Sequence, residues 1–234
     1  GSAVTTGHEN LFIGDIAGNT ITTGTANCFV GRRTGGGSRA GSSNNTIVGQ
    51  EAGGSGTGVV HNNTLVGYYA GKEVEGNDNT FIGSLAGEDV TTGANNICIG
   101  KDADASSATV SNEITLGNAS ISTLRCQVTS ITALSDRRDK TDINTLDLGL
   151  DFIDSLKPVK FKWDSREGIL KDGTYEAGFI AQDFQQAQKD NDADYLGLVL
   201  ESNPDKLEAT PGKLIPILVK AIQELKQEIE LLKS

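Results

Sequence analysis

The chain has 234 residues, 29 of them glycine, and a formal net charge of −11 at neutral pH. This length allows one large domain or two ordinary ones, and the acidic balance argues against a protein that binds the phosphate backbone of nucleic acids. No apolar run approaches the roughly 18 residues that a membrane-spanning helix needs. The three cysteines and two histidines have no metal-site spacing. We therefore expect no cofactor, no metal, no nucleic-acid partner and no membrane insertion.

The composition changes sharply near residues 120–135. Residues 1–134 hold 23 of the 29 glycines and no proline, whereas residues 135–234 hold all four prolines, the tryptophan and 14 of the 20 basic residues. We predict a mainly β repeat region at 1–118, a linker at 119–134 and an α+β domain over the rest. The absence of methionine and the leading glycine–serine pair suggest a fragment cut from a longer protein.

The first region repeats a short unit with a period of 16 to 18 residues. Units such as NTIVGQEAG and NTLVGYYAG place an asparagine, an apolar run, a glycine and a small residue at fixed positions. The glycine recurs at Gly14, Gly31, Gly49, Gly67, Gly83, Gly100 and Gly117, and the asparagine at Asn10, Asn27, Asn45, Asn63, Asn79 and Asn96. A short β-favouring run before a glycine that permits positive φ is typical of a strand followed by a turn. The period predicts stacked coils of a β-solenoid, with a hydrogen-bonded asparagine ladder and an alanine at each crowded inner corner.

Each predicted coil offers few apolar side chains, so we expect the coils to bury surface against sister chains. The repeats resemble the head repeats of trimeric autotransporter adhesins and the shaft repeats of phage tail fibres, although the usual unit of those heads is shorter. The resemblance implies a homotrimeric fibre on a virion tail or on a bacterial cell surface.

Variable turns separate the fixed positions of the repeat, and loops of this kind often carry recognition. Adjacent tyrosines or an arginine cluster can bind a sugar or an anionic glycan of a cell-surface receptor. The candidate ligand contacts are Arg32, Arg33, Tyr68 and Tyr69, with Arg39 in the same class of turn. The alternative is that these side chains are solvated or pack between chains.

In the second region, Ser135 and Lys140 are five residues apart. A lysine that accepts a proton can activate a serine hydroxyl as a nucleophile, but this spacing alone has no specificity. The surrounding segment SDRRDKTDI is similar to the SDxRLKxDI opening of the intramolecular chaperone, or autoprocessing serine peptidase, domain of phage tail spikes such as endosialidases. GLDFIDSLKPVKFKWD, AGFIAQDFQ and KLIPILVKAIQELKQEIELLK resemble later segments of that family, in the same order.

This resemblance implies that Ser135 is the nucleophile, that Lys140 is its general base, and that the scissile bond joins Leu134 to Ser135. It implies a domain that drives trimerisation and folding and then cleaves its own chain once. Asp136 is expected to cap a turn rather than to catalyse, and Asp139 stands where the family has leucine. The alternatives are a structural or receptor-binding fibre with an inactive chaperone domain, and a glycan-degrading tail spike.

The last segment predicts a helix over residues 212–233, with Pro216 near its start, where a missing N–H is tolerated. Apolar residues recur there in steps of three and four, at Ile215, Leu218, Ile222, Leu225, Ile229 and Leu232. The spacing favours a coiled-coil seam; the alternative is an amphipathic helix packed on its own domain. Isoleucine and leucine at these positions favour a parallel dimer, whereas the resemblance implies the trimer that we expect.

Overall fold

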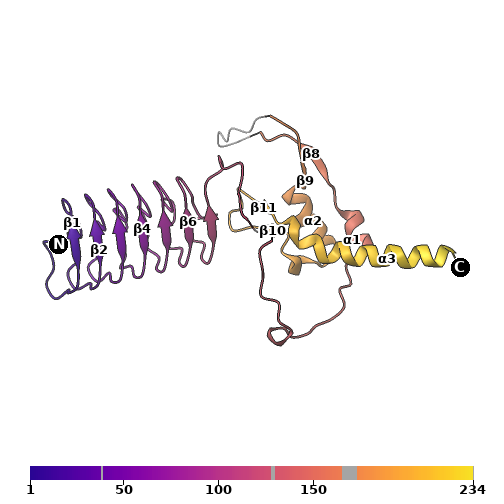
Figure 1. The fold of residues 1–234 in the computed structure, drawn as a ribbon, viewed down its shortest axis with the longest axis horizontal. Coiled ribbons are helices and arrows are strands. Elements are labelled where there is room, and N and C mark those ends of the chain that lie inside the picture. Colours follow the sequence, from indigo (N-terminus) through magenta and orange to yellow (C-terminus); the bar gives the residue numbers. More distant parts are fainter. Residues whose placement is uncertain (38, 128–129, 165–172, 234) are drawn as a thin grey trace. The chain divides into compact units, whose positions relative to one another are not determined.

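The protein is described by a computed structural model in which two compact units follow each other, Gly1–Ser122 and Thr123–Ser234 (Figure 1). The described residues are 1–37, 39–127, 130–164 and 173–233. Residues 128–129 of the predicted linker, and 165–172 and 234 of the predicted second domain, lie outside them. The predicted fold class is confirmed, because a parallel β-solenoid precedes a mixed α/β region that ends in a helix.

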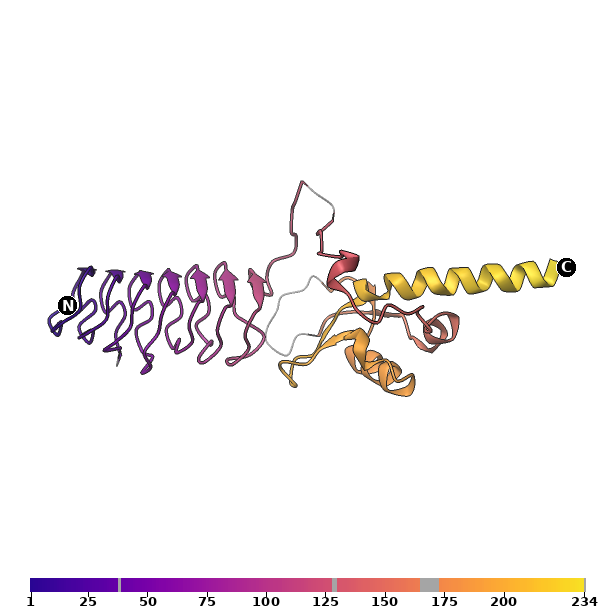
Figure 2. The same cartoon turned by 90° about the horizontal axis from the view of Figure 1, so that it is seen from below.

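The first unit is one seven-stranded parallel sheet in which each strand pairs with the next strand in the chain. Its strands are β1 (Leu11–Ile13), β2 (Cys28–Val30), β3 (Thr46–Val48), β4 (Thr64–Val66), β5 (Thr80–Ile82), β6 (Ile97–Ile99) and β7 (Ile114–Leu116). The register joins equal repeat positions, so Phe12 pairs with Phe29 and Phe29 with Ile47. Figures 1 and 2 show one strand in each coil, all in a single row.

The core of the solenoid is a narrow stack of inward side chains. The middle residue of each strand from β2 to β6 is fully buried, and so are the small residues at the inner corner. The buried alanines, which confirm the predicted corner position, are Ala17, Ala52, Ala70, Ala86 and Ala103. Each coil therefore depends on its two neighbours for most of its burial.

The predicted asparagine ladder is present and runs through every coil. The backbone N–H of Asn63 donates to Asn45 Oδ1 at 3.0 Å, and that of Asn79 donates to Asn63 Oδ1 at 2.8 Å. The Nδ2 of Asn63 also donates to the Gly76 carbonyl at 3.0 Å. Glu113 holds the seventh place, where its N–H donates to Asn96 Oδ1 at 3.0 Å. The ladder thus satisfies backbone groups that water does not reach.

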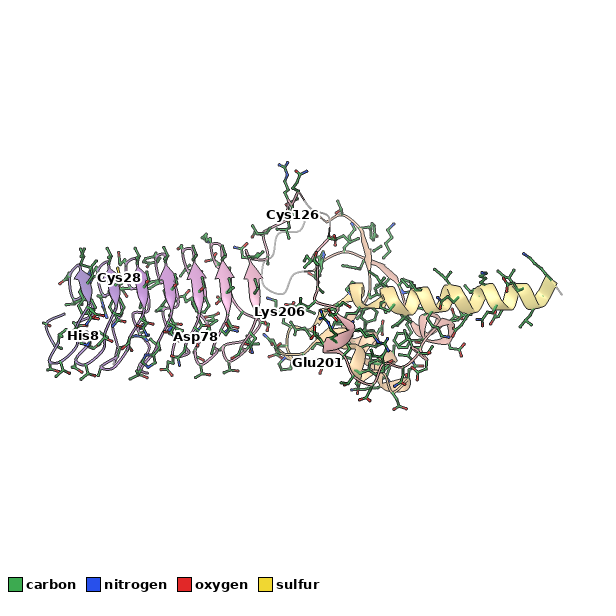
Figure 3. The ribbon with its side chains drawn as sticks, turned by 60° about the horizontal axis from the view of Figure 1, so that its bottom comes forward. His8, Cys28, Asp78, Cys126, Glu201 and Lys206 are labelled. Carbon is green, nitrogen blue, oxygen red and sulfur yellow. The ribbon has the colours of Figure 1, made fainter. Side chains whose placement is uncertain are left out.

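The outer face of the same sheet is apolar and open to solvent. The first and third residues of the strands lie on this face, since Cys28 and Val30 are half-buried whereas Phe29 between them is fully buried. Figure 3 marks Cys28 at the row of strands. The exposed large apolar side chains on this face are Leu11, Ile13, Ile82, Ile99, Ile114 and Leu116. This face is therefore a surface that a single chain leaves without an apolar partner.

The second unit has two short antiparallel sheets, which pair β8 with β9 and β10 with β11. Its elements are the 3-10 turn η1 (Arg137–Asp139), α1 (Leu150–Ser155), β8 (Val159–Phe161), β9 (Glu176–Gly178), α2 (Ala181–Asp190), η2 (Asp194–Leu196), β10 (Val199–Leu200), β11 (Glu208–Ala209), η3 (Pro211–Leu214) and α3 (Ile215–Lys233). Its core gathers Phe152, Phe184, Ala193, Leu198, Leu214 and Ile217. The fold thus holds α1, α2 and the start of α3 on one core.

The last helix packs on its own unit with one face and leaves the seam free. Ile217 and Ala221 are buried, and Glu224 Oε2 accepts a 2.7 Å hydrogen bond from the Leu150 N–H at the start of α1. This bond lowers the pKa of Glu224 and replaces the side-chain cap that Gly149 does not supply. The α-helix begins three residues later than we predicted, because Pro211–Leu214 form a 3-10 turn.

The six predicted seam residues of α3 are all exposed, by 42 to 88%. Within the second unit, the C-terminal half of α3 projects past the other elements in both views (Figures 1 and 2). The predicted seam and the packing on the domain therefore use different faces of one helix.

Candidate functional site

Ser135 and Lys140 meet in the structure. Lys140 Nζ donates to Ser135 Oγ at 2.5 Å. The turn η1 between them folds the chain back, since the Asp139 N–H donates to the Asp136 carbonyl and the Lys140 N–H to the Arg137 carbonyl, both at 3.2 Å. A serine and a lysine that are distant along an extended chain are thereby brought to hydrogen-bond distance.

Asp136 caps this turn, as the sequence predicted. Its Oδ1 accepts from the Arg138 N–H at 2.8 Å, and the Arg138 guanidinium donates to both carboxylate oxygens at 2.6 to 3.2 Å. The Arg138 bonds hold the pKa of Asp136 below its usual range, and Asp136 in turn raises the pKa of Arg138. Because the pair is exposed, it adds little stability. Its effect is to fix the geometry of the turn that carries Lys140.

The peptide bond before Ser135 is accessible. Leu134 is 100% exposed, and the Ser135–Lys140 hydrogen bond is exposed as well. A hydroxyl, an amine and the carbonyl carbon of the preceding residue thus lie in one short segment. These are the groups that an intramolecular acyl transfer needs, because the nucleophile and the electrophile belong to the same chain.

The candidate ligand contacts on the solenoid fall into two rows along its turns. Arg32 and Tyr68 occupy one row, and Arg33 and Tyr69 the next, where φ is +56° for both. The coil of Gln50 and Glu51 stands between them, as shown by the hydrogen bond from the Tyr69 N–H to the Gln50 carbonyl. The structure therefore separates the arginines from the tyrosines by one coil, whose Glu51 interacts with both Arg32 and Tyr69.

These side chains also differ in their partners. Arg32 pairs with Glu51 at 3.5 Å and with Asp15 at 3.9 Å. The rings of Tyr68 and Tyr69 lie 4.1 Å apart, and a hydrogen bond between the two side chains is the main reason that the pKa of Tyr69 is raised to about 12. Arg32, Tyr68 and Tyr69 thus already contact other side chains of the solenoid.

Arg39 was misplaced by sequence reasoning, because it is fully buried rather than exposed in a turn. Its Nε donates to the Gly36 and Gly53 carbonyls at 3.0 and 3.2 Å, and Nη2 donates to the Val74 carbonyl at 2.8 Å. Burial lowers its pKa to about 10, against the opposing effect of Glu75. One signal was readable: Arg39 stands at the place that Ile21 fills in the first coil, in a segment too glycine-rich to supply another core side chain.

Across the described part of the chain, no group of three or more His, Cys, Asp and Glu side chains is placed to hold a metal ion. None of the helices described is both long and apolar enough to span a membrane.

A family model described as the chaperone of endosialidase matches residues 135–192. Searches of curated proteins and of solved structures found no match. This family implies an autocatalytic serine peptidase, and its domains occur in phage tail fibres and spikes. The C-terminal region of the chain therefore contains a chaperone-of-endosialidase domain, which follows a β-solenoid with turns of about 17 residues.

Proposed function

We propose that the chain is the C-terminal part of a homotrimeric tail fibre or surface adhesin. Its terminal domain drives trimerisation and folding, and then cuts itself off between Leu134 and Ser135. The observation that carries the proposal is the hydrogen bond between Lys140 Nζ and Ser135 Oγ, at the residue where the family match begins. The site of action is a virion tail fibre or a bacterial cell surface.

The cut is an acyl transfer followed by hydrolysis. Lys140, in its neutral form, takes the proton of the Ser135 hydroxyl, and Oγ attacks the carbonyl carbon of Leu134 through a five-membered ring. The C–O bond forms, the C–N bond of the peptide breaks, and the nitrogen of Ser135 leaves with a proton as a new amino terminus. Water then hydrolyses the ester, which frees the Leu134 carboxylate and restores the serine hydroxyl. The reaction occurs once per chain.

Two apolar surfaces support a homotrimer. The seam of α3 is exposed along the whole helix, and its steps of three and four match a parallel coiled coil. The outer face of the solenoid sheet is a second apolar strip without a partner in the single chain. Two further copies of the chain cover both surfaces with the same residues, whereas an unrelated partner would have to match two different patterns.

The order of events follows from kinetics. The solenoid pairs strands from different coils, so its contacts are non-local and its register is slow to form. Helices that associate first raise the local concentration of the coils. Removing residues 135–234 afterwards takes away the route of folding while the barrier to unfolding remains, and the released fibre is then kinetically stable.

The cleavage is tested by incubating the purified chain and measuring intact masses. We expect fragments of residues 1–134 and 135–234 from the parent, and only the uncut chain from Ser135→Ala and from Lys140→Met. Each variant lacks either the nucleophile or the base, so we expect a loss of at least about 100-fold in rate.

Ser130→Ala and Lys157→Met are the matched controls, because both residues are exposed and lie outside the turn. Both should cut at the parental rate. Fragments from Ser135→Ala would reveal another protease, and an uncut parent would favour the non-cleaving fibre with an inactive chaperone domain.

The trimer is tested in the uncut Ser135→Ala background by light scattering. We expect Ser135→Ala to have three times the mass of one chain. Adding Leu225→Asp should lower this mass, because an unpaired charge buried in the seam destabilises the interface by roughly several kcal/mol. Gln223→Asp is the control, since this exposed residue belongs neither to the seam nor to the face that packs on α1. A monomer mass for the parent, or an equal effect of the two changes, would contradict the proposed seam.

A further inference from the structure

A groove of about 440 Å³ opens on the turn side of the first three coils. It is lined by the side chains of Asn19, Thr20, Arg33 and Thr57 and by the backbone of Gly36 and Gly54, among others. The glycines keep side chains off the floor because a Cβ at Gly36 would lie 2.6 Å from the Gly54 carbonyl oxygen. Ile16 adds an apolar side chain to these polar ones, so the walls are of mixed character above the glycine floor. None of the described residues that line the groove is a carboxylate.

Arg33 brings a positive charge to this groove that nothing in the described solenoid neutralises. The unit Gly1–Ser122 has eleven carboxylate side chains and five basic ones. Arg32, Lys72 and Lys101 each pair with a carboxylate, and Arg39 is buried. Among the residues that the structure describes, Arg33 is the exposed base of the solenoid for which no such pair exists. An acidic protein that leaves this one cation free in a groove has a local site for an anion.

A second positive charge lies behind the floor. Arg39 Nε donates to the carbonyls of Gly36 and Gly53, next to the glycines that line the groove. Its Nη1 is buried and lacks a hydrogen-bond partner among the described residues. Glu75, whose negative charge acts on Arg39, accepts two hydrogen bonds from Thr57, at 2.7 and 3.1 Å. The charges of Arg39 and Glu75 therefore oppose each other behind the floor, and Arg33 supplies the positive charge that a ligand in the groove would contact.

The polar walls have hydrogen-bonding capacity left. The Thr20 hydroxyl accepts from the Arg39 N–H at 3.4 Å and retains its own proton as a donor. The Thr57 hydroxyl donates to Glu75 and retains its lone pairs as acceptors. The Asn19 amide supplies both kinds of group. These three side chains suit neighbouring hydroxyl groups of a ligand, each of which both donates and accepts.

We propose that this groove binds a sugar that carries a carboxylate, with Arg33 holding the carboxylate and Asn19, Thr20 and Thr57 holding hydroxyl groups. One free guanidinium matches one negative charge in bidentate geometry. A phosphate has more charge than this single contact neutralises, and a neutral sugar leaves Arg33 unused. Binding at this groove does not require the proposed function. Its biological role does rest on that function, because the role is attachment of the proposed fibre to an acidic surface glycan.

The test measures the binding of D-glucuronate to the uncut Ser135→Ala chain by isothermal titration and by NMR, with D-glucose and inorganic phosphate as comparison ligands. We expect a dissociation constant on the order of millimolar for a single sugar, at least about tenfold weaker binding of glucose, and a loss of affinity with added salt. Arg33→Gln should weaken glucuronate at least about tenfold, because a bidentate charged contact is removed.

Arg32→Gln is the matched control, because the adjacent arginine is paired and does not line the groove. It should bind glucuronate as the parent does, and both variants should keep the parental circular dichroism spectrum. Arg33→Lys keeps the charge without the bidentate geometry, so its affinity for glucuronate should lie between those of the parent and of Arg33→Gln. Absence of glucuronate binding, tighter binding of phosphate, or equal losses in the two Gln variants would overturn the site. Because the Ser135→Ala chain does not cut, none of these outcomes depends on the cleavage chemistry.

Discussion

The Gly67→Val variant is expected to form no folded solenoid. Gly67 directly follows β4 with φ +144°, a backbone conformation that residues with a side chain rarely adopt, and a Cβ there would lie 2.1 Å from the Gly83 carbonyl oxygen. The next coil cannot move away, because the Gly83 N–H donates to the Val66 carbonyl at 2.8 Å. Backbone strain and overlap together cost several kcal/mol, roughly, which is comparable with the stability of a whole domain. Far-UV circular dichroism and soluble yield measure the loss.

Gly58→Ala is the matched control, because the nearest atom to a Cβ at Gly58 is Glu75 Cβ at 3.5 Å, an ordinary contact. This variant and Tyr68→Ala, which changes an exposed turn side chain, should fold like the parent. If Gly67→Val folds normally, or if the controls fail equally, then the fixed glycines are not what sets the spacing of the coils.

The second large effect is expected for Asn63→Asp, which changes one atom in the asparagine ladder. Asn63 is 1% exposed, and its Nδ2 donates to Asn45 Oδ1 and to the Gly76 carbonyl. A carboxylate offers these two acceptors no proton and places a buried charge against them. We expect a loss of about 3–5 kcal/mol in the free energy of unfolding at neutral pH. Urea denaturation of the uncut chain measures it.

The loss should depend on pH with a defined sign. Burial disfavours the charged form, so the introduced carboxyl has a higher pKa in the folded state than in the unfolded state. Its penalty is therefore smallest below about pH 4, where both states are protonated, and grows as the pH rises. Asn95→Asp, at an exposed turn residue whose Nδ2 donates to Asn112 Oδ1, should change stability by less than about 1 kcal/mol. A penalty that is equal at both sites or constant with pH would show that the ladder asparagines are not desolvated.

The repeating part of the fold was predictable because every coil is built from the same sequence of local structures. A strand, a turn at positive φ and a buried amide recur at each period, so one unit explains the others. The burial of Arg39 has one such signal, its alignment with the core residue Ile21, but a charge in the core is rare and this one depends on carbonyls from three different coils. The groove beside Arg33 likewise depends on how three coils align, which no single repeat encodes.

In the second unit, local patterns predicted more than long-range ones did. The cap at Asp136 and the helical seam follow from spacing within a few residues. The contact between Lys140 and Ser135 depends on the turn that the cap builds. Only the family resemblance indicated that these two residues form a catalytic pair. The packing of Ile217 on the domain, and the bond from Leu150 to Glu224, join residues distant in sequence and carried no readable signal.

The asparagine ladder also determines how the solenoid can change in evolution. Each coil receives hydrogen bonds from the coil after it and gives the same bonds to the coil before it. Two coils that were never neighbours therefore already match, and unequal recombination between repeats lengthens or shortens the fibre by whole coils without creating a new interface. The exception is the stretch that Arg39 ties together, from Gly36 to Val74, where the coils are no longer interchangeable. Variation in fibre length should accordingly accumulate after that stretch, toward Asn96 and Glu113.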